Sequence, residues 1–214
     1  MSTTWFTADP HFGHANIIKY CQRPFLSDRE VELAKSDPRG KWQVSPGTVA
    51  RHDQALIDSI NDRVQPRDQF WILGDFCWGD DAAAKSYLDR MVCKNVNFVW
   101  GNHDKRSIRG FFKRTMDQGM IKVRGQKIWL NHYPMRSWDG RFHGSWQLYG
   151  HVHDRMSEED RKTPSLLTRD VGVDACNYRP ISFDEIAAYM KPRIKVFEAE
   201  KAKFIAGQAS ANID

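Results

Sequence analysis

Five short polar segments of the sequence each follow an apolar run, and each carries side chains that bind metal ions in proteins. The segments are Asp9-Pro10-His11, Gly74-Asp75, Gly101-Asn102-His103-Asp104, Asn131-His132 and Gly150-His151-Val152-His153. Strand ends position side chains rigidly, and in α/β sheets ligands gather at the carboxyl ends of the strands. We therefore expect the five segments to converge on one site.

The candidate ligands are of the imidazole, carboxylate and amide types. They are Asp9, His11, Asp75, Asn102, His132, His151 and His153. Imidazole and carboxylate together suit Mn most of all, with Fe, Zn, Ni or Mg as alternatives. Seven ligands exceed the needs of one tetrahedral zinc ion but suit two ions that share a bridging carboxylate. Paired ions about 3.5–4 Å apart stabilise both oxygens of a phosphoryl displacement and acidify a water, so the set predicts a two-metal hydrolytic site.

The individual motifs differ in strength. Asp-x-His is weak evidence on its own, and Gly-Asp after a strand is usually a turn. Gly-His-x-His is stronger, because residues i and i+2 of an extended segment share a face, which would point His151 and His153 into one site. Gly-Asn-His-Asp after a strand is hard to explain by packing. The ordered combination favours a metal site over these structural explanations.

The composition is that of an ordinary globular protein, with 41% hydrophobic and 28% charged residues in a chain of 214. No apolar run approaches the roughly 20 residues of a membrane span, and the first residues lack the features of a secretory signal. The four cysteines are widely spaced, so we expect free thiols and a cytoplasmic location. The net charge of +5 favours anionic partners.

Hydrophobic periodicity predicts a sheet-centred α/β fold. Strands are predicted at residues 4–8, 70–73, 96–100, 146–149 and 170–174, with a hairpin formed by 121–123 and 128–130. Strand and helix alternate in the first half of the chain, whereas the second half is richer in strand pairs. Helices should therefore lie outside the sheets.

Three helices and a helical tail are expected. The helices cover residues 49–63 after an N-cap at Thr48, Asp80 or Asp81 to about Met91, and 182–190 with a capping box at Ser182-Phe183-Asp184-Glu185. Residues 24–47 contain several Pro and Gly, which predicts an irregular excursion. One domain is expected over residues 1–191, followed by a C-terminal helical tail over 192–214.

The array of motifs from Asp9 to His153 resembles the calcineurin-like metallophosphoesterase superfamily, and most of all its small single-domain bacterial and phage-type phosphoesterases. Val171-Gly172-Val173-Asp174 is similar to the closing strand of that family. The resemblance implies a four-layer α/β/β/α sandwich of two mixed β-sheets flanked by helices. This agrees with the elements predicted from periodicity.

The resemblance also implies a role for each matching residue. Asp9, His11 and His153 would bind a first metal, Asn102, His132 and His151 a second, and Asp75 would bridge them. His103 is not a ligand in the family but contacts the phosphoryl group or protonates the leaving oxygen, so it is the candidate catalytic residue. Asp80 and Asp81 do not fit the family pattern after Gly-Asp and are left out of the site.

Two further residues are candidates for substrate binding. His14 resembles an additional histidine of this subgroup, and its alternative is a loop histidine that caps the backbone. Arg136 follows His132 closely and could hold a phosphate through two hydrogen bonds, or lie free on the surface. His52, in contrast, is expected to be structural and Cys77 inert.

The resulting hypothesis is a phosphoesterase that hydrolyses phosphomono- or phosphodiester bonds by direct attack of a metal-bound hydroxide. The basic charge tilts the expected partners towards nucleotides or nucleic acid, and no membrane partner is expected. The alternative is a metal-binding but catalytically idle scaffold of the same fold, although such proteins usually lose ligands that are all present here. Oligomeric state and metal identity stay open.

Overall fold

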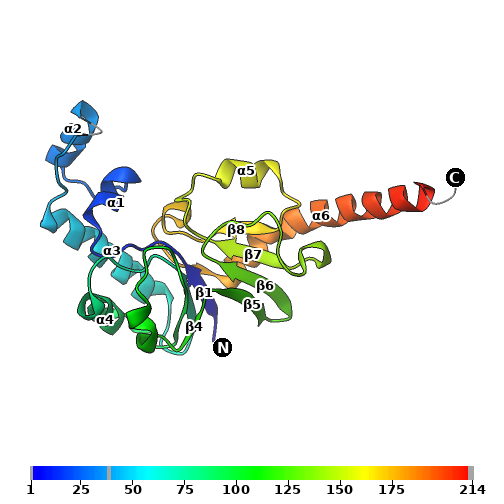
Figure 1. Cartoon of the computed structure of the whole chain (residues 1–214), viewed down its shortest axis with the longest axis horizontal. Coiled ribbons are helices and arrows are strands. Elements are labelled where there is room, and N and C mark those ends of the chain that lie inside the picture. The colour runs from blue at the N-terminus through cyan, green and yellow to red at the C-terminus, as the bar shows by residue number, and fades with distance from the viewer. Residues whose placement is uncertain (1, 38–39, 212–214) are drawn as a thin grey trace.

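The computed structural model describes residues 2–37 and 40–211, which form two β-sheets with helices outside them (Figure 1). The first sheet has the strand order β4-β3-β2-β1-β9 and the second the order β5-β6-β7-β8. The first contains β1 (Thr4–Thr7), β2 (Gln69–Leu73), β3 (Val96–Val99), β4 (Arg114–Met116) and β9 (Ile181–Ser182). The second contains β5 (Gln118–Val123), β6 (Gln126–Asn131), β7 (Trp146–Tyr149) and β8 (Thr168–Asp170).

Both sheets are mixed. Strands β1 to β4 pair in parallel, and β9 pairs antiparallel to β1. In the second sheet β5 and β6 form an antiparallel hairpin, whereas β6, β7 and β8 run parallel. The carboxyl ends of β1, β2 and β3 therefore meet at one edge of the first sheet, and those of β6, β7 and β8 meet at one edge of the second.

Two hydrophobic cores hold the layers together. Leu73 of the first sheet and Leu130 and Leu148 of the second belong to one buried cluster, so the sheets pack face to face. On the outer face of the first sheet, Ile72 packs in a second cluster with residues of α3 (Pro46–Arg63) and α4 (Asp81–Arg90). On the outer face of the second, Tyr149 donates to Asp160 of α5 (Ser157–Lys162) at 2.6 Å. The predicted four-layer arrangement is confirmed.

The segment between residues 24 and 47 is more ordered than the sequence analysis expected. It contains α2 (Asp28–Ser36), preceded by the short helix α1 (Ala15–Tyr20). Ser27 and Glu30 form a reciprocal capping box at the start of α2, a signature that the surrounding Pro and Gly obscured. The predicted irregular excursion is therefore wrong for residues 28–36.

Three other boundaries differ from the predictions. Helix α3 is capped by Ser45 rather than Thr48, with Pro46 in its first turn, where a missing N–H costs nothing. The hairpin turn is confined to Arg124 and Gly125, both at positive φ. Strand β8 ends at Asp170, and the predicted strand 170–174 instead turns into a short 3₁₀ helix, η3 (Asp174–Cys176).

The last helix, α6 (Phe183–Ala211), runs through Pro192 without a break, so the predicted end near Met190 is wrong. Its capping box at Ser182 and Glu185 is confirmed, and Ile186 and Met190 pack into the core between the sheets. The far end of α6 extends beyond the body of the molecule (Figure 1). The division at residue 192 stays a prediction.

Two short 3₁₀ helices complete the described chain: η1 (Arg106–Phe111) and η2 (Arg141–His143). Within residues 2–37 and 40–211, none of the helices combines the length and apolarity that crossing a membrane requires.

Candidate metal centre

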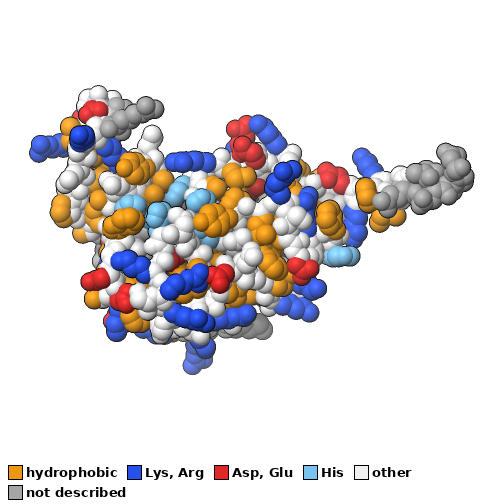
Figure 2. All heavy atoms as spheres, viewed as in Figure 1, with side chains coloured by type: hydrophobic (Ala, Val, Ile, Leu, Met, Phe, Trp, Pro, Cys, Tyr) orange, Lys and Arg blue, Asp and Glu red, His pale blue; other side chains and the backbone are white. Residues whose placement is uncertain are grey.

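The five polar segments converge: backbone hydrogen bonds join the loops after β1 and β2 and those after β6 and β7, and the amides of His151 and His103 donate to the carboxylates of Asp9 and Asp75. The Asp9 amide donates to the Gly74 carbonyl at 3.1 Å, and the His11 amide donates to Asp75 at 3.0 Å. The Gly150 amide donates to the His132 carbonyl at 2.9 Å. The convergence expected from strand polarity is thus present, and Figure 2 shows several histidine side chains gathered in one place on this face of the molecule.

The backbone at the centre is held in a conformation that side-chain-bearing residues rarely adopt. Five of the seven candidate ligands have positive φ angles: Asp9 (55°), His11 (49°), Asp75 (54°), His151 (69°) and His153 (48°). Such residues cost free energy that the surrounding structure must offset, and they concentrate at functional sites. The Gly-His-x-His segment is consequently not extended, which corrects the assumed geometry: its two histidines point into different halves of the centre.

Two glycines allow the carboxylates to approach bare backbone. A Cβ on Gly101 would lie 2.3 Å from Oδ1 of Asp75, and a Cβ on Gly150 would lie 2.4 Å from Oδ2 of Asp9. Both distances are far shorter than real Cβ contacts. The glycines of the Gly-Asn-His-Asp and Gly-His-x-His motifs therefore make room for the two carboxylates.

A first group of metal-competent atoms comprises Asp9, His11 and His153, whose ligand atoms lie within 4.8 Å of one another. Asp9 and His11 are almost fully buried. Within the described part of the chain, Oδ1 of Asp9 and Nε2 of His11 are buried without a hydrogen-bond partner. Since buried polar atoms are nearly always paired, these two atoms fit the ligands of a cation.

A second group comprises Asp75, His132 and His151, again with ligand atoms within 4.8 Å. His132 is fully buried, and its Nε2 lies 3.1 Å from Oδ1 of Asn102. The amide oxygen of Asn102 thus faces the same point as the imidazole, as expected for a fourth member of this group.

Asp75 lies between the two groups. Its Oδ2 is 3.5 Å from Nε2 of His11 in the first group and 3.5 Å from Nε2 of His132 in the second. Its Oδ1 accepts a hydrogen bond from the His103 amide at 3.0 Å, which fixes the carboxylate. A carboxylate that bridges two ions must lie next to ligands of both groups, and Asp75 occupies such a position.

Two histidines are oriented by hydrogen bonds at Nδ1. Nδ1 of His132 donates to the Leu73 carbonyl at 2.8 Å, and Nδ1 of His153 donates to Oδ2 of Asp174 at 2.7 Å. In the neutral imidazole this places the lone pair on Nε2, the nitrogen that is then available to a metal. Both rings are therefore held in a ligating tautomer.

Asp174 and Arg23 lie behind the candidate ligands, in positions that sequence reasoning did not predict. The buried Arg23 guanidinium donates to Asp174 Oδ1 at 2.9 Å and Oδ2 at 2.8 Å, and to the Asp9 carbonyl at 2.9 Å. It therefore ties the carboxylate behind His153 to the loop that carries Asp9. The only sequence signal for Asp174 was its place after the apolar Val171–Val173 run, and Arg23 was only a weak candidate for the surroundings of the site.

Burial and hydrogen bonding shift the pKa values of the acids and histidines in the site in opposite directions. Burial raises the pKa of Asp9 to about 7 and lowers that of His11 to about 2. Burial opposes charge on His132 and His153 too, but hydrogen bonds with Asp75 and Asp174 raise their pKa values to about 9 and about 10. The carboxylates of Asp75 and Asp174 therefore favour positive charge on the imidazoles that they contact.

The candidate catalytic and substrate-binding residues differ in placement. His103 is exposed and its ring centroid lies 5.7 Å from that of His11, so it borders the centre. His14 lies 5.4 Å from His11 and stacks on Trp78. Arg136 is exposed, and its backbone carbonyl accepts a hydrogen bond from the Arg141 guanidinium. The structure therefore brings His103 and His14 to the centre but shows no such position for Arg136.

Several other polar residues are structural. Asp104 accepts hydrogen bonds from the backbone amides of Asp75, Phe76 and Gly101, so it caps the turn. Burial raises the pKa of Cys77 to about 12, in agreement with an inert thiol. His52 is fully buried and hydrogen-bonded to Arg23 and Asp53, in agreement with a structural role.

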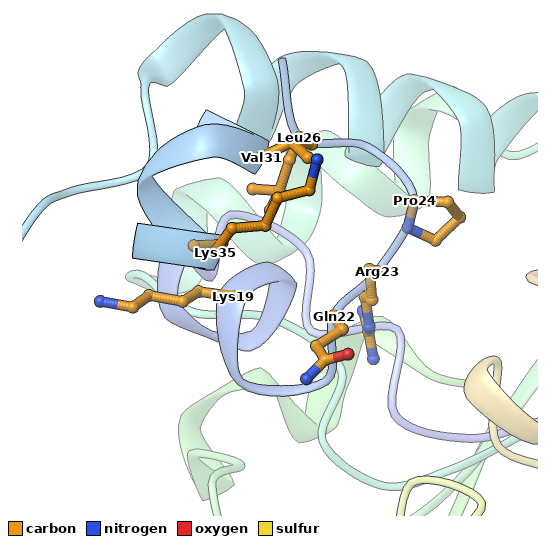
Figure 3. A pocket seen from close by; sticks show the side chains of 8 residues that line it. Lys19, Gln22, Arg23, Pro24, Leu26, Val31 and Lys35 are labelled. Carbon is orange, nitrogen blue, oxygen red and sulfur yellow. The ribbon is translucent and has the colours of Figure 1, made fainter. Parts of the chain in front are cut away.

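A cavity of about 450 Å³ lies between α1 and α2 (Figure 3). Lys19, Gln22 and Lys35 line it, and the Arg23 side chain runs away from it into the protein. The guanidinium of Arg23 thus connects the wall of this cavity to the loop that carries Asp9.

Comparison with known proteins identifies the family. The calcineurin-like phosphoesterase superfamily domain matches residues 47–169, more than half of the 214 residues. The match includes Asp75, His103 and His132, whereas Asp9 and His11 precede it. The chain belongs to the calcineurin-like phosphoesterase superfamily, which confirms the resemblance seen in the motifs.

Relatives occur in archaea and phages. An uncharacterised protein of Methanocaldococcus jannaschii is 30% identical over 188 residues, covering 87% of this chain and 90% of that protein. Gene 66 protein of Mycobacterium phage D29 is 24% identical over 204 residues, covering 82% and 89%. A protein of unknown function from Aquifex aeolicus has a solved structure with a TM-score of 0.63 at 22% identity, covering 88% of this chain and 100% of that one, and so shares the fold.

Proposed function

We propose that the protein is a two-metal phosphoesterase that hydrolyses phosphomono- or phosphodiester bonds. The observation that supports it best is the position of Asp75, whose Oδ2 lies 3.5 Å from a histidine nitrogen of each group. Superfamily membership supports a metal-dependent phosphoesterase in general. The pairing of two ions through Asp75 is our inference from the geometry.

The donor set suits a pair of divalent transition-metal ions. Asp9, His11 and His153 would hold one ion, and His132, His151 and Asn102 the other, with Asp75 shared. Imidazole with carboxylate favours Mn²⁺, Fe²⁺ or Zn²⁺ over Ca²⁺, which prefers oxygen alone. When bound, such a pair lowers the pKa of a water and neutralises charge on the phosphoryl oxygens.

The chain's own residues would perform the remaining tasks. Asp174 and the Leu73 carbonyl keep His153 and His132 in their ligating tautomers. His103 stands on the solvent side of Asp75, anchored by its amide, so a protonated ring there can donate to the leaving oxygen of a substrate. Arg23 keeps the Asp9 loop and Asp174 together from behind.

The second candidate is an idle metal-binding scaffold. Complete ligand groups and an exposed His103 beside them speak for catalysis, since a scaffold needs no proton donor. The expected cytoplasmic location stays a prediction.

Hydrolysis of bis(4-nitrophenyl) phosphate and 4-nitrophenyl phosphate by purified protein, stripped with chelator and then reloaded, tests the proposal. We expect loss of activity on stripping and better recovery with Mn²⁺ than with Ca²⁺. Full activity of a verified metal-free preparation would contradict a metal-dependent mechanism. Stoichiometric metal binding without hydrolysis of either ester would favour the scaffold.

A further inference from the structure

Two exposed aromatic side chains border the histidine groups. Trp78 is 53% exposed and Tyr133 is 42% exposed. The indole of Trp78 stacks on His14, with ring centroids 4.4 Å apart and planes 10° apart. The ring of Tyr133 lies 4.6 Å from that of His151. Each aromatic ring therefore lies next to the candidate metal centre while remaining open to solvent.

Backbone contacts fix the position of Trp78 without burying its ring. Its amide donates to the Phe12 carbonyl at 2.7 Å. The Trp78 carbonyl oxygen lies so close to Gly13 that a Cβ there would approach it to 2.9 Å. On the other side, the carbonyl of Gly79 accepts a hydrogen bond from Lys105 Nζ at 2.7 Å. The loop that presents the indole is thus held on both sides.

The indole is linked to the metal groups through single imidazole rings. His14 lies against Trp78 and 5.4 Å from His11, a member of the first group. His103 lies 5.9 Å from Trp78 and 5.7 Å from His11. A phosphate ester at His11 and His103 would therefore place the group attached to its phosphorus within reach of Trp78.

We propose that Trp78 stacks on a planar ring of the substrate, so that the preferred substrates are phosphodiesters of nucleosides whose base is unpaired. The proposal rests on the phosphoesterase function proposed above and specifies its substrate class. A nucleobase is the planar ring that biological phosphate esters commonly carry, and aromatic side chains accept any base because each has a π-face. A paired base inside a duplex would not offer that face.

The charge around the ring agrees with this substrate. The ammonium of Lys105 is held next to Trp78 through Gly79, where it favours the phosphate of a neighbouring nucleotide. Figure 2 shows lysine and arginine side chains on the same face as the histidines, with hydrophobic side chains next to them. Aromatic rings combined with a positive surface are typical of proteins that bind single strands.

The competing explanation is that Trp78 only covers His14. Two esters with the same leaving group distinguish these roles: thymidine 5′-(4-nitrophenyl phosphate) and its abasic counterpart, 2-deoxyribose 5-(4-nitrophenyl phosphate). Wild type is compared with Trp78→Ala, Trp78→Phe and the matched control Phe142→Ala, whose ring is 66% exposed on η2. The ratio of kcat/KM for the two esters is measured for each variant.

We expect wild type to prefer the thymidine ester about 5- to 150-fold, the range that one stacked base contributes. The ratio should fall towards one in Trp78→Ala, recover partly in Trp78→Phe and stay at the wild-type value in Phe142→Ala. A ratio near one in wild type, or an unchanged ratio in Trp78→Ala, would overturn the proposal, because a cover for His14 would affect both esters alike.

Calorimetric binding of thymidine 5′-phosphate and deoxyribose 5-phosphate provides a readout without turnover. If the protein hydrolyses neither ester but binds the thymidine compound more tightly through Trp78, the stacking site stands and the phosphoesterase function fails. Equal binding of the two compounds by wild type would reject the stacking site, whatever the activity.

Discussion

The Nδ1 atom of His153 lies 2.7 Å from Oδ2 of Asp174, and both side chains are largely shielded from solvent. The pair connects the Gly-His-x-His turn after β7 to the 3₁₀ helix η3, which Arg23 fixes from the other side. A carboxylate behind a ligating histidine sets its tautomer and raises its basicity. We therefore expect Asp174 to tune the first group through its hydrogen bond with His153.

Replacing Asp174 by Asn should weaken metal binding about 10- to 100-fold, the usual effect of losing a partner behind a ligating histidine. Competition with a chromophoric chelator measures the affinity, and circular dichroism checks the fold. Asp154→Asn is the matched control, since Asp154 follows His153 directly but accepts from the Ser157 hydroxyl. Unchanged affinity in a folded Asp174→Asn protein would show that the pair is only structural.

Substitution His103→Ala should lower kcat by about 10²–10⁴-fold for a substrate with a poor leaving group and leave the metal content intact. The loss should be smaller for a nitrophenyl ester, because nitrophenolate leaves without a proton. His143→Ala, an exposed histidine on η2, serves as control. Equal losses for both leaving groups would reject the acid role, and loss of a metal ion would make His103 a ligand.

The substitution Gly101→Ala should displace Asp75 from its position. A Cβ there would lie 2.3 Å from Oδ1 and 2.6 Å from the amide of Asp75, so we expect a stability loss of about 1–3 kcal/mol together with reduced metal content. Gly110→Ala is the control, because its Cβ would meet no atom within 4 Å. Similar metal content in the two folded variants would mean that the close approach is not needed.

Glu30 joins the starts of α2 and α3. Its carboxylate accepts from the Ser45 amide and the Thr48 hydroxyl at 2.6 Å each, and from the Ser27 amide at 2.8 Å. Burial alone would raise its pKa, but these hydrogen bonds lower the pKa of Glu30 to about 2, from an unfolded value of 4.5. The stabilisation of the folded state by the ionised Glu30 carboxylate is therefore complete above pH 4.5 and is lost as the pH falls towards 2.

Glu30→Gln should reduce the free energy of unfolding by about 1–3 kcal/mol at neutral pH. The free energy of unfolding in urea should then fall more steeply between pH 4.5 and 2.5 for wild type than for Glu30→Gln. The control is Glu32→Gln, since Glu32 is exposed on the same helix and paired with Lys35. Parallel pH profiles for wild type and Glu30→Gln would contradict this role.

The sequence predicted the site better than the segments around it. Apolar runs followed directly by metal-competent residues located the loops after β1, β2, β3, β6 and β7, since strand ends determine where such side chains meet. The left-handed backbone at His151 and His153 was not predictable, because only the surrounding contacts stabilise it. Helix α2 was missed although Ser27 and Glu30 carry its capping signal.

Long-range partners explain what else was missed. Arg23 is 151 positions from Asp174, and nothing local to either residue marks the ion pair between them. Pro192 predicted a helix end, because proline removes a hydrogen bond and clashes with the preceding turn of a helix, yet α6 continues through it and is anchored by the packing of Ile186 and Met190 in the core. Tertiary contacts of this kind determine the local structure where the local sequence signals conflict.

The most direct test of the two-metal centre is the metal content of wild type and Asp75→Asn, measured by inductively coupled plasma mass spectrometry after reconstitution with Mn²⁺. Asp75 faces both ligand groups, so wild type should hold two ions per chain and the variant one or none, with a larger loss of hydrolysis than any other single ligand change. Two tightly bound ions and near-normal turnover in Asp75→Asn would contradict the bridging role and the account built on it.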